Sequence, residues 1–153
     1  MLSGDFWPQG RVGLIIEIDG IPTPDHNSLD GVSVLVVEDA ADNQLLMRRI
    51  LTRNGAQVDI AENGVEGIRM ALANNYDVVL MDLQMPMKDG FEATAELRHQ
   101  GYRRPILAVS ASALVEEQNH ALRAGCDDHI TKPIDMKTLI QNVIAYAAHR
   151  KSM

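Results

Sequence analysis

Residues 32–39 read Val-Ser-Val-Leu-Val-Val-Glu-Asp, a short apolar run that ends abruptly in two acidic residues. The run is rich in β-branched side chains and is apolar on both faces, which predicts a strand covered by helices on each side. Glu38 and Asp39 therefore stand at the carboxyl end of a buried strand. Ligands of open parallel sheets bind at that end, so the acidic pair is a candidate functional site.

Further short apolar runs follow along the chain and alternate with stretches of helical periodicity. The predicted strands after the first are 58–61, 78–81, 106–109 and 129–131, and the predicted helices are 42–54, 65–74, 91–99, 115–124 and 136–149. Gly55 and Gly125 supply the expected stop signals after two of these helices. Five strands alternating with five helices predict an α/β fold with a doubly wound parallel sheet and right-handed crossovers.

Composition narrows the class of protein. The chain has 153 residues, of which 46% are hydrophobic and 23% charged, enough for one domain with a buried core. Its net charge of −7 argues against general binding of nucleic acid. The single cysteine, Cys126, suits a reducing compartment. No apolar run is long enough to cross a membrane and no signal peptide is recognisable, so we expect a cytoplasmic domain without membrane contact.

The amino-terminal residues have a different character from the rest of the chain. Residues 12–18 predict a short strand, and a proline-bearing connector follows it. We place a boundary near Asp30 and Gly31, which gives an arm or linker over residues 1–30 and a domain over residues 31–150.

Polar side chains stand at the carboxyl ends of four predicted strands. Glu38 and Asp39 follow the first strand, and Asp82 ends the third. Ser110 ends the fourth strand, and Lys132 lies just past the fifth. Because parallel strands present their carboxyl ends at one edge of a sheet, we expect these side chains to gather in one crevice.

Such a cluster has a defined chemistry. Three carboxylates at short range need a counter-ion, and a hard divalent cation, Mg²⁺ or alternatively Mn²⁺, meets that need. With this metal and the Lys132 ammonium present, Asp82 could accept a phosphoryl group while Ser110 donates a hydrogen bond to it.

Each of these residues alone also has a structural interpretation. Asp39 could cap a helix, Ser110 could satisfy backbone groups at a strand end, and Lys132-Pro133 could be a turn. Asp82 is harder to explain in that way, because it follows a run that should be buried.

Four segments resemble the receiver domains of two-component response regulators, in order over residues 32–148. They are Val36-Val37-Glu38-Asp39, the ten residues Met81 to Gly90, the seven residues Pro105 to Ala111, and Thr131-Lys132-Pro133-Ile134. The residues around Asp82 are most similar to receivers of hybrid histidine kinases and phosphorelays. The resemblance implies a flavodoxin-like sheet with strand order 2-1-3-4-5 and five helices.

The resemblance also implies roles for individual residues. Asp82 would take a phosphoryl group from the phosphohistidine of a histidine kinase or a histidine phosphotransfer protein. Asp39 and Asp82 would ligate Mg²⁺, Glu38 would act mainly through water, and the backbone carbonyl of Gln84 would complete the set.

The remaining roles concern switching. Lys132 would pair with Asp82 and then with the phosphoryl group, and the Lys132–Pro133 peptide bond would be cis. Ser110 would be the switch hydroxyl. His129 stands where relatives commonly carry a switch tyrosine or phenylalanine, and its ring is titratable. The surface that changes would be formed by the fourth helix, fifth strand and fifth helix, which could also mediate a homodimer.

We therefore expect a Mg²⁺-dependent phosphoacceptor receiver, most similar to the carboxyl-terminal receiver of a hybrid histidine kinase. A stand-alone response regulator and a pseudo-receiver that never takes phosphate are the alternatives. A phosphatase with an aspartyl nucleophile is less favoured, because Gln84 stands where a second acid/base carboxylate is usual. The isolated domain would thus catalyse only its own phosphorylation and dephosphorylation. Nucleotide binding is disfavoured, because no glycine-rich loop follows the first strand.

Overall fold

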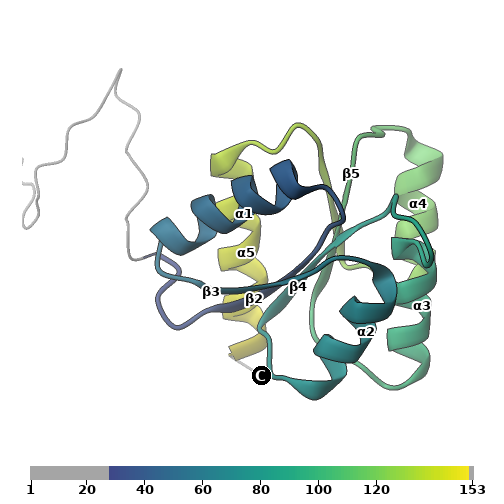
Figure 1. Cartoon of the computed structure of the whole chain (residues 1–153), viewed down its shortest axis with the longest axis horizontal. Coiled ribbons are helices and arrows are strands. Elements are labelled where there is room, and N and C mark those ends of the chain that lie inside the picture. The colour runs from purple at the N-terminus through teal and green to yellow at the C-terminus, as the bar shows by residue number, and fades with distance from the viewer. Residues whose placement is uncertain (1–27, 152–153) are drawn as a thin grey trace, which may run out of the picture.

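A parallel five-stranded sheet runs through the part of the chain that the computed structural model describes, residues 28–151 (Figure 1). The strands are β2 (Ser33–Val37), β3 (Gln57–Ala61), β4 (Val78–Asp82), β5 (Ile106–Ser110) and β6 (Asp128–Thr131). Their order across the sheet is β3-β2-β4-β5-β6, and each neighbouring pair is parallel. The predicted flavodoxin-like sheet is confirmed. The strand expected over residues 12–18 lies outside the described residues.

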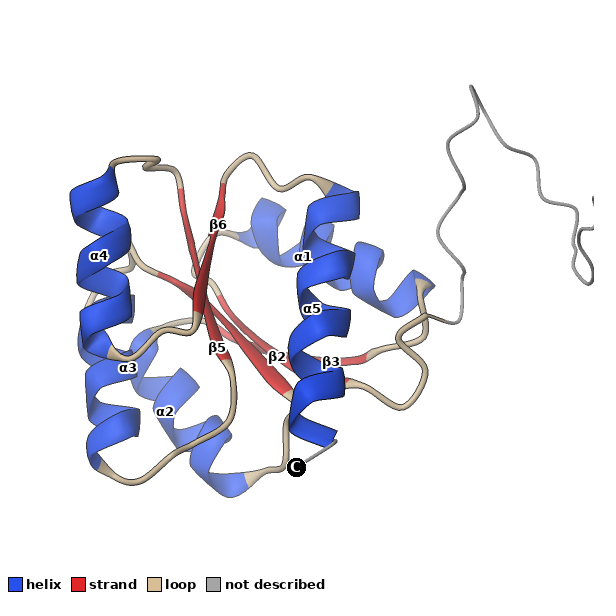
Figure 2. Ribbon diagram, turned by 180° about the vertical axis from the view of Figure 1, so that it is seen from behind, coloured by secondary structure: helices blue, strands red, loops and turns tan. Residues whose placement is uncertain are grey.

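Helices cover both faces of this sheet (Figures 1 and 2). On one face lie α1 (Ala41–Arg53) and α5 (Met136–Lys151). On the other lie α2 (Gly64–Ala73), α3 (Gly90–His99) and α4 (Val115–Ala124). The boundaries of α4 are as predicted, and the other boundaries agree with those predicted to within two residues. For example, α3 begins at Gly90, because Asp89 and Glu92 form a reciprocal capping box at its start.

The packing of β2 explains why the apolar run at residues 32–37 lacks a polar face. Val34 and Val36 pack in the core under α1 and α5, whereas Leu35 and Val37 pack in the core under α2, α3 and α4. Successive side chains of a strand point to opposite faces, so a strand between two helical layers needs apolar residues at every position. All four side chains are fully buried.

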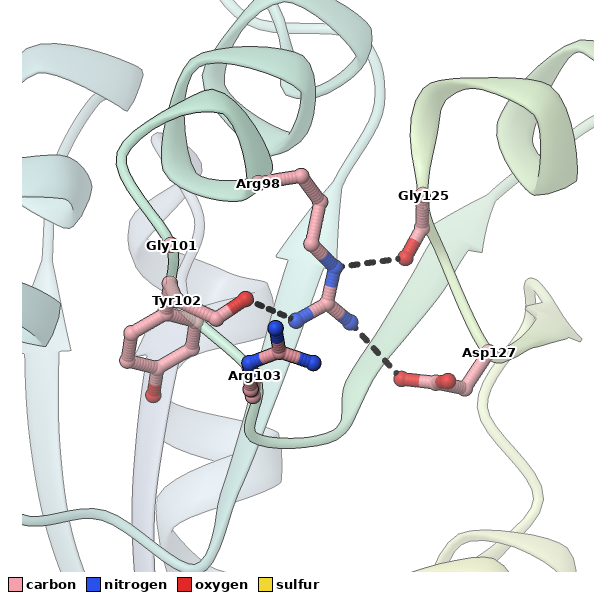
Figure 3. A pocket seen from close by; sticks show the side chains of 6 residues that line it. All are labelled: Arg98, Gly101, Tyr102, Arg103, Gly125 and Asp127. Carbon is pink, nitrogen blue, oxygen red and sulfur yellow. Dashed lines mark hydrogen bonds and ion pairs between the residues drawn. The ribbon is translucent and has the colours of Figure 1, made fainter.

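Arg98 ties together the loops at the amino-terminal ends of β5 and β6, away from the strand ends that carry Ser110 and Lys132 (Figure 3). Its guanidinium donates to the carbonyls of Tyr102 and Gly125, at 2.7 and 2.9 Å, and pairs with Asp127 at 2.9 Å. These residues line a cavity of about 350 Å³. Among residues 28–151, none of the helices is both long enough and apolar enough to cross a bilayer.

Candidate functional site

The strand register brings the acidic residues together. Val37 of β2 pairs with Met81 of β4, so Glu38 comes level with Asp82 at the carboxyl edge of the sheet. Carboxylate oxygens of Glu38, Asp39 and Asp82 all lie within 4.8 Å of one another. Glu38 is fully buried and Asp82 is 3% exposed, whereas Asp39 is exposed. Three carboxylates thus share one small pocket with a single open side.

The loop between β2 and α1 holds Glu38 in place through its own backbone and side chain. Oε2 of Glu38 accepts a hydrogen bond from the Ala40 N–H at 3.1 Å, and the Glu38 carbonyl accepts one from the Gln44 amide at 2.6 Å. The N-cap position of α1 is Ala40, whose side chain cannot cap a helix. Helix capping therefore does not account for Asp39.

The loop after β6 places the Lys132 ammonium beside the carboxylates. Ser110 of β5 pairs with Thr131 of β6, and the Lys132 N–H donates to the Ser110 carbonyl at 2.7 Å. The Lys132–Pro133 peptide bond is cis. The Lys132 ammonium lies 3.1 Å from Oε1 of Glu38 and 3.5 Å from Oδ1 of Asp82, so the lysine bridges two of the three carboxylates.

The environment of Asp82 shifts its ionisation toward neutral pH in the absence of a metal. Burial raises the pKa of Asp82 to about 7, and the nearby charge of Glu38 adds to the rise. The Gln84 N–H, which donates to Oδ1 of Asp82 at 3.2 Å, and the Lys132 ammonium act in the opposite direction. A cation that bound beside Asp82 would therefore compete with a proton for this carboxylate.

Gly90 lets α3 begin directly against the end of β4. A Cβ atom at this position would collide with the backbone carbonyl of Asp82 and with Leu83. The absence of a side chain at Gly90 thus allows the helix to support the residue that bears the central carboxylate.

The Ser110 hydroxyl makes contacts with β6, with α4 and with the loop that follows β5. Ser110 Oγ lies 3.0 Å from Nε2 of His129 on β6 and 3.0 Å from Oε1 of Glu117 on α4. The Ser112 N–H also donates to Ser110 Oγ, at 3.3 Å. Burial lowers the pKa of His129, while the carboxylates of Glu117 and Asp128 oppose that change.

The donor set fits a hard divalent cation. The pocket offers carboxylate oxygens, which are the ligands that Mg²⁺ prefers, and its exposed side at Asp39 leaves room for water ligands. Oε1 of Glu38 is buried and, among residues 28–151, accepts no hydrogen bond. Its described neighbour is the Lys132 ammonium, so it retains capacity for a metal-bound water.

The comparisons with known proteins identify the class. The family model for the response regulator receiver domain matches residues 34–144. The chain belongs to this family, whose members are phosphoacceptors of two-component signalling.

Relatives with curated descriptions include histidine kinases. The chain is 40% identical over 117 residues to hybrid signal transduction histidine kinase G of Dictyostelium discoideum, and it is 35% identical over 124 residues to the sensor histidine kinase RcsC of Escherichia coli. These alignments cover 73% and 80% of this chain but only 3% and 13% of the two kinases. The chain thus spans a small part of the relatives it matches.

Solved receiver domains have the same fold. The receiver of sensor histidine kinase PA1611 from Pseudomonas aeruginosa, which has a magnesium ion in its active-site cleft, superimposes with a TM-score of 0.72 at 33% identity. That match covers 77% of this chain and 98% of the other. The receiver of Saccharomyces cerevisiae Ssk1, solved with the histidine phosphotransfer protein Ypd1, gives 0.74 at 26% identity, covering 80% and 92%. Of these two receivers, one thus holds Mg²⁺ in its active-site cleft and the other binds a histidine phosphotransfer protein.

Two features of the site escaped the sequence reasoning. Lys132 was expected to pair with Asp82, yet its ammonium lies closer to Glu38. Glu117 was not singled out, because acidic residues are common in the first turn of a helix and Glu116 has the same position relative to the helix dipole. A carboxylate seven residues after a strand-end serine, across one loop and one helical turn, is the signal that could have drawn attention to it.

Proposed function

We propose that Asp82 accepts a phosphoryl group from a phosphohistidine and that this reaction depends on Mg²⁺. The observation that supports the proposal most strongly is the meeting of two further carboxylates and one ammonium around the buried Asp82. In the transfer, an oxygen of Asp82 forms a bond to phosphorus as the phosphorus–nitrogen bond of the donor breaks. The electron pair of that bond leaves with the imidazole.

The surrounding residues of the chain have complementary tasks in this proposal. Asp39, Asp82, Glu38 through water and the Gln84 carbonyl would hold Mg²⁺ (or Mn²⁺), which offsets charge on the phosphoryl oxygens when bound. Lys132 pairs with Asp82 before transfer and with a phosphoryl oxygen afterwards. Ser110 donates a hydrogen bond to another phosphoryl oxygen.

Exposed apolar side chains near the pocket support a protein as the phosphodonor. Leu45 and Leu46 lie in the first half of α1, Met87 lies in the loop after β4, and Met136 begins α5. These segments all follow carboxyl ends of strands, so their apolar side chains border the acidic pocket. We propose that a histidine kinase or a histidine phosphotransfer protein docks there; the Ssk1 receiver, which has the same fold, was solved in complex with the histidine phosphotransfer protein Ypd1.

For the whole protein, we propose a hybrid histidine kinase in which this chain is the carboxyl-terminal receiver, because a hybrid histidine kinase and a sensor histidine kinase are among the curated relatives. A stand-alone response regulator is the alternative. A reducing cytoplasm suits the free and buried thiol of Cys126. The residues before the domain, 1–30, would then be a linker.

We further propose that the face formed by α4, β6 and α5 transmits the signal and can pair with a second copy. Leu114, Val115 and Leu122 are exposed on or beside α4, which supports a protein contact there. Sedimentation of the chain with and without beryllofluoride, a mimic of the phosphoryl group, tests pairing.

Incubation with acetyl phosphate and Mg²⁺, followed by intact-mass measurement, tests the central proposal. The native chain should gain the mass of one phosphoryl group, and Asp82→Asn should not gain it. Asp42→Asn, which removes an exposed carboxylate from the first turn of α1, is the matched control and should behave as the native chain does. No adduct on the native chain would indicate a pseudo-receiver, and repeated release of phosphate would indicate a hydrolase.

A further inference from the structure

The hydroxyl of Ser110 is saturated in this structure, and its one proton has a definite destination. Ser110 Oγ contacts Oε1 of Glu117 at 3.0 Å, Nε2 of His129 at 3.0 Å, the backbone N–H of Ser112 at 3.3 Å and the backbone carbonyl of Ser112 at 3.4 Å. The Ser112 N–H can only donate, and the ionised carboxylate of Glu117 can only accept. The Glu117 carboxylate is charged and lies nearer to Ser110 Oγ than the Ser112 carbonyl does, so we assign the serine proton to Glu117.

The same accounting fixes the role of His129. A hydroxyl has one proton to donate and two lone pairs with which to accept. With the proton assigned to Glu117 and one lone pair to the Ser112 N–H, the second lone pair is left for His129, and we assign to its ring the tautomer that carries a proton on Nε2. The hydroxyl is thus held by α4 on one side and by β6 on the other, and it has no proton left for an acceptor in the acidic pocket.

A phosphoryl group on Asp82 needs the proton that Glu117 holds. This argument rests on the proposed phosphorylation of Asp82, in which Ser110 donates to a phosphoryl oxygen. The phosphoryl group and Glu117 are both anions and both acceptors, so they cannot share one proton and they repel each other. Donation to the phosphoryl group requires Ser110 to break its hydrogen bond to Glu117.

We propose that Glu117 is a positioning residue that competes with the phosphoryl group for the Ser110 proton and so holds the domain in its unphosphorylated form. Glu117 lies in the first turn of α4, directly after the exposed Leu114 and Val115. When the hydrogen bond between Ser110 and Glu117 breaks, the first turn of α4 is no longer held to β5 by this contact. The competition links occupancy of Asp82 to the position of the α4 surface, and it lowers the affinity of the native pocket for a phosphoryl group.

Titration with beryllofluoride in the presence of Mg²⁺, followed by ¹H–¹⁵N spectra, tests this role. Glu117→Gln keeps the size of the side chain but removes its charge, so we expect the apparent affinity for beryllofluoride to rise about threefold to tenfold. The amides of Ser112 and Leu114 in the ligand-free variant should shift part of the way toward their ligand-bound positions. Glu116→Gln removes the same charge from the same helical turn without a contact to Ser110, and it should leave affinity and spectra as in the native chain.

The same comparison in a chain that already carries Ser110→Ala distinguishes this role from a purely structural one. If Glu117 acts through the serine proton, Glu117→Gln should give no gain in affinity when Ser110→Ala is already present. Equal affinities for the native chain, Glu117→Gln and Glu116→Gln would overturn the inference, and so would a gain that persists without the serine hydroxyl. A native chain that binds no beryllofluoride and takes no phosphoryl group from acetyl phosphate would instead overturn the proposed function.

Discussion

Lys132 and Glu38 form an ion pair in which the ammonium nitrogen lies 3.1 Å from Oε1 of a fully buried carboxylate. Loss of one partner from a buried pair leaves a charge without compensation. We therefore expect Lys132→Met to lower the free energy of unfolding by about 2–3 kcal/mol in metal-free buffer, measured by urea denaturation. Mg²⁺ should restore part of this loss, because a divalent cation in the pocket would compensate the same carboxylates.

Lys137→Met provides the matched control. Lys137 is exposed on α5, a few residues further along the chain. Its replacement should change the free energy of unfolding by less than about 0.5 kcal/mol. An equal, small effect of both substitutions would show that the Lys132 ion pair contributes little to the fold.

Binding of Mg²⁺ should stabilise the folded chain through linkage. At a Mg²⁺ concentration about tenfold above the dissociation constant, the free energy of unfolding should rise by about 1.4 kcal/mol, which calorimetry reports as a higher Tm. Asp39→Asn should weaken this response, because it removes a carboxylate from the pocket while leaving the buried strands intact. Asp42→Asn should retain the full response, and a similar loss in both variants would place the metal elsewhere.

The lowered pKa of His129 makes a prediction about acid stability. The unfolded chain takes up a proton on this residue near pH 6.5, whereas the folded chain does so only at a lower pH. The folded state therefore loses stability as the pH falls below about 6.5, and it keeps this contribution at higher pH.

Replacement of His129 isolates its share of this pH dependence. His129→Gln should lose less stability than the native chain between about pH 7 and pH 5, by under about 1 kcal/mol, because water screens the half-buried ring. Urea denaturation at several pH values measures the difference. His99→Gln, at an exposed position near the end of α3, is the comparison. Parallel pH profiles for native chain and His129→Gln would refute the prediction.

Arg98 should matter for stability but not for phosphorylation. Its guanidinium donates to the carbonyl of Gly125, which has a φ of +119° at the end of α4, and it pairs with Asp127. Arg98→Met should cost about 2–3 kcal/mol of unfolding free energy, because these contacts have a charged donor. The fraction of the chain phosphorylated by acetyl phosphate should stay unchanged under conditions in which the variant is folded.

The exposed Arg103 lines the same cavity and is the control for Arg98 (Figure 3). Arg103→Met should change the free energy of unfolding by less than about 0.5 kcal/mol. The prediction separates the Arg98 contacts, which stabilise the fold at one end of the sheet, from the acidic pocket at the other end. A large effect of Arg103→Met on the free energy of unfolding, or a change in phosphorylation by Arg98→Met, would contradict it.

The fold could be predicted from the sequence because two layers of helix leave an unusually clear pattern in the strands. Residues 78–81 and 106–109 are apolar throughout and fully or almost fully buried, as strands between two helical layers must be. The last strand gave the weakest pattern. It begins at Asp128, one residue before the predicted start, because a short edge strand has few buried residues to mark its limits.

The gathering of polar residues at one edge of the sheet could also be predicted from the sequence, whereas the detailed contacts between them could not. Strand order and register are enough to bring Glu38, Asp82 and Lys132 to one edge. Which carboxylate lies nearer the lysine depends on the path of the cis loop and on side-chain rotamers, which no spacing in the sequence encodes. The contact between Glu117 and Ser110 depends likewise on how closely the first turn of α4 approaches β5.

The order of the strands separates positions where substitution would disturb the core from positions that can vary more freely. The acidic groups follow β2 and β4, two of the three inner strands, where almost any substitution would disturb both cores. Ser110 and Lys132 follow β5 and β6, toward one margin, and the helix they influence lies at the outside. New binding preferences can therefore arise by altering the exposed residues of α4, while the reactive centre stays as it is.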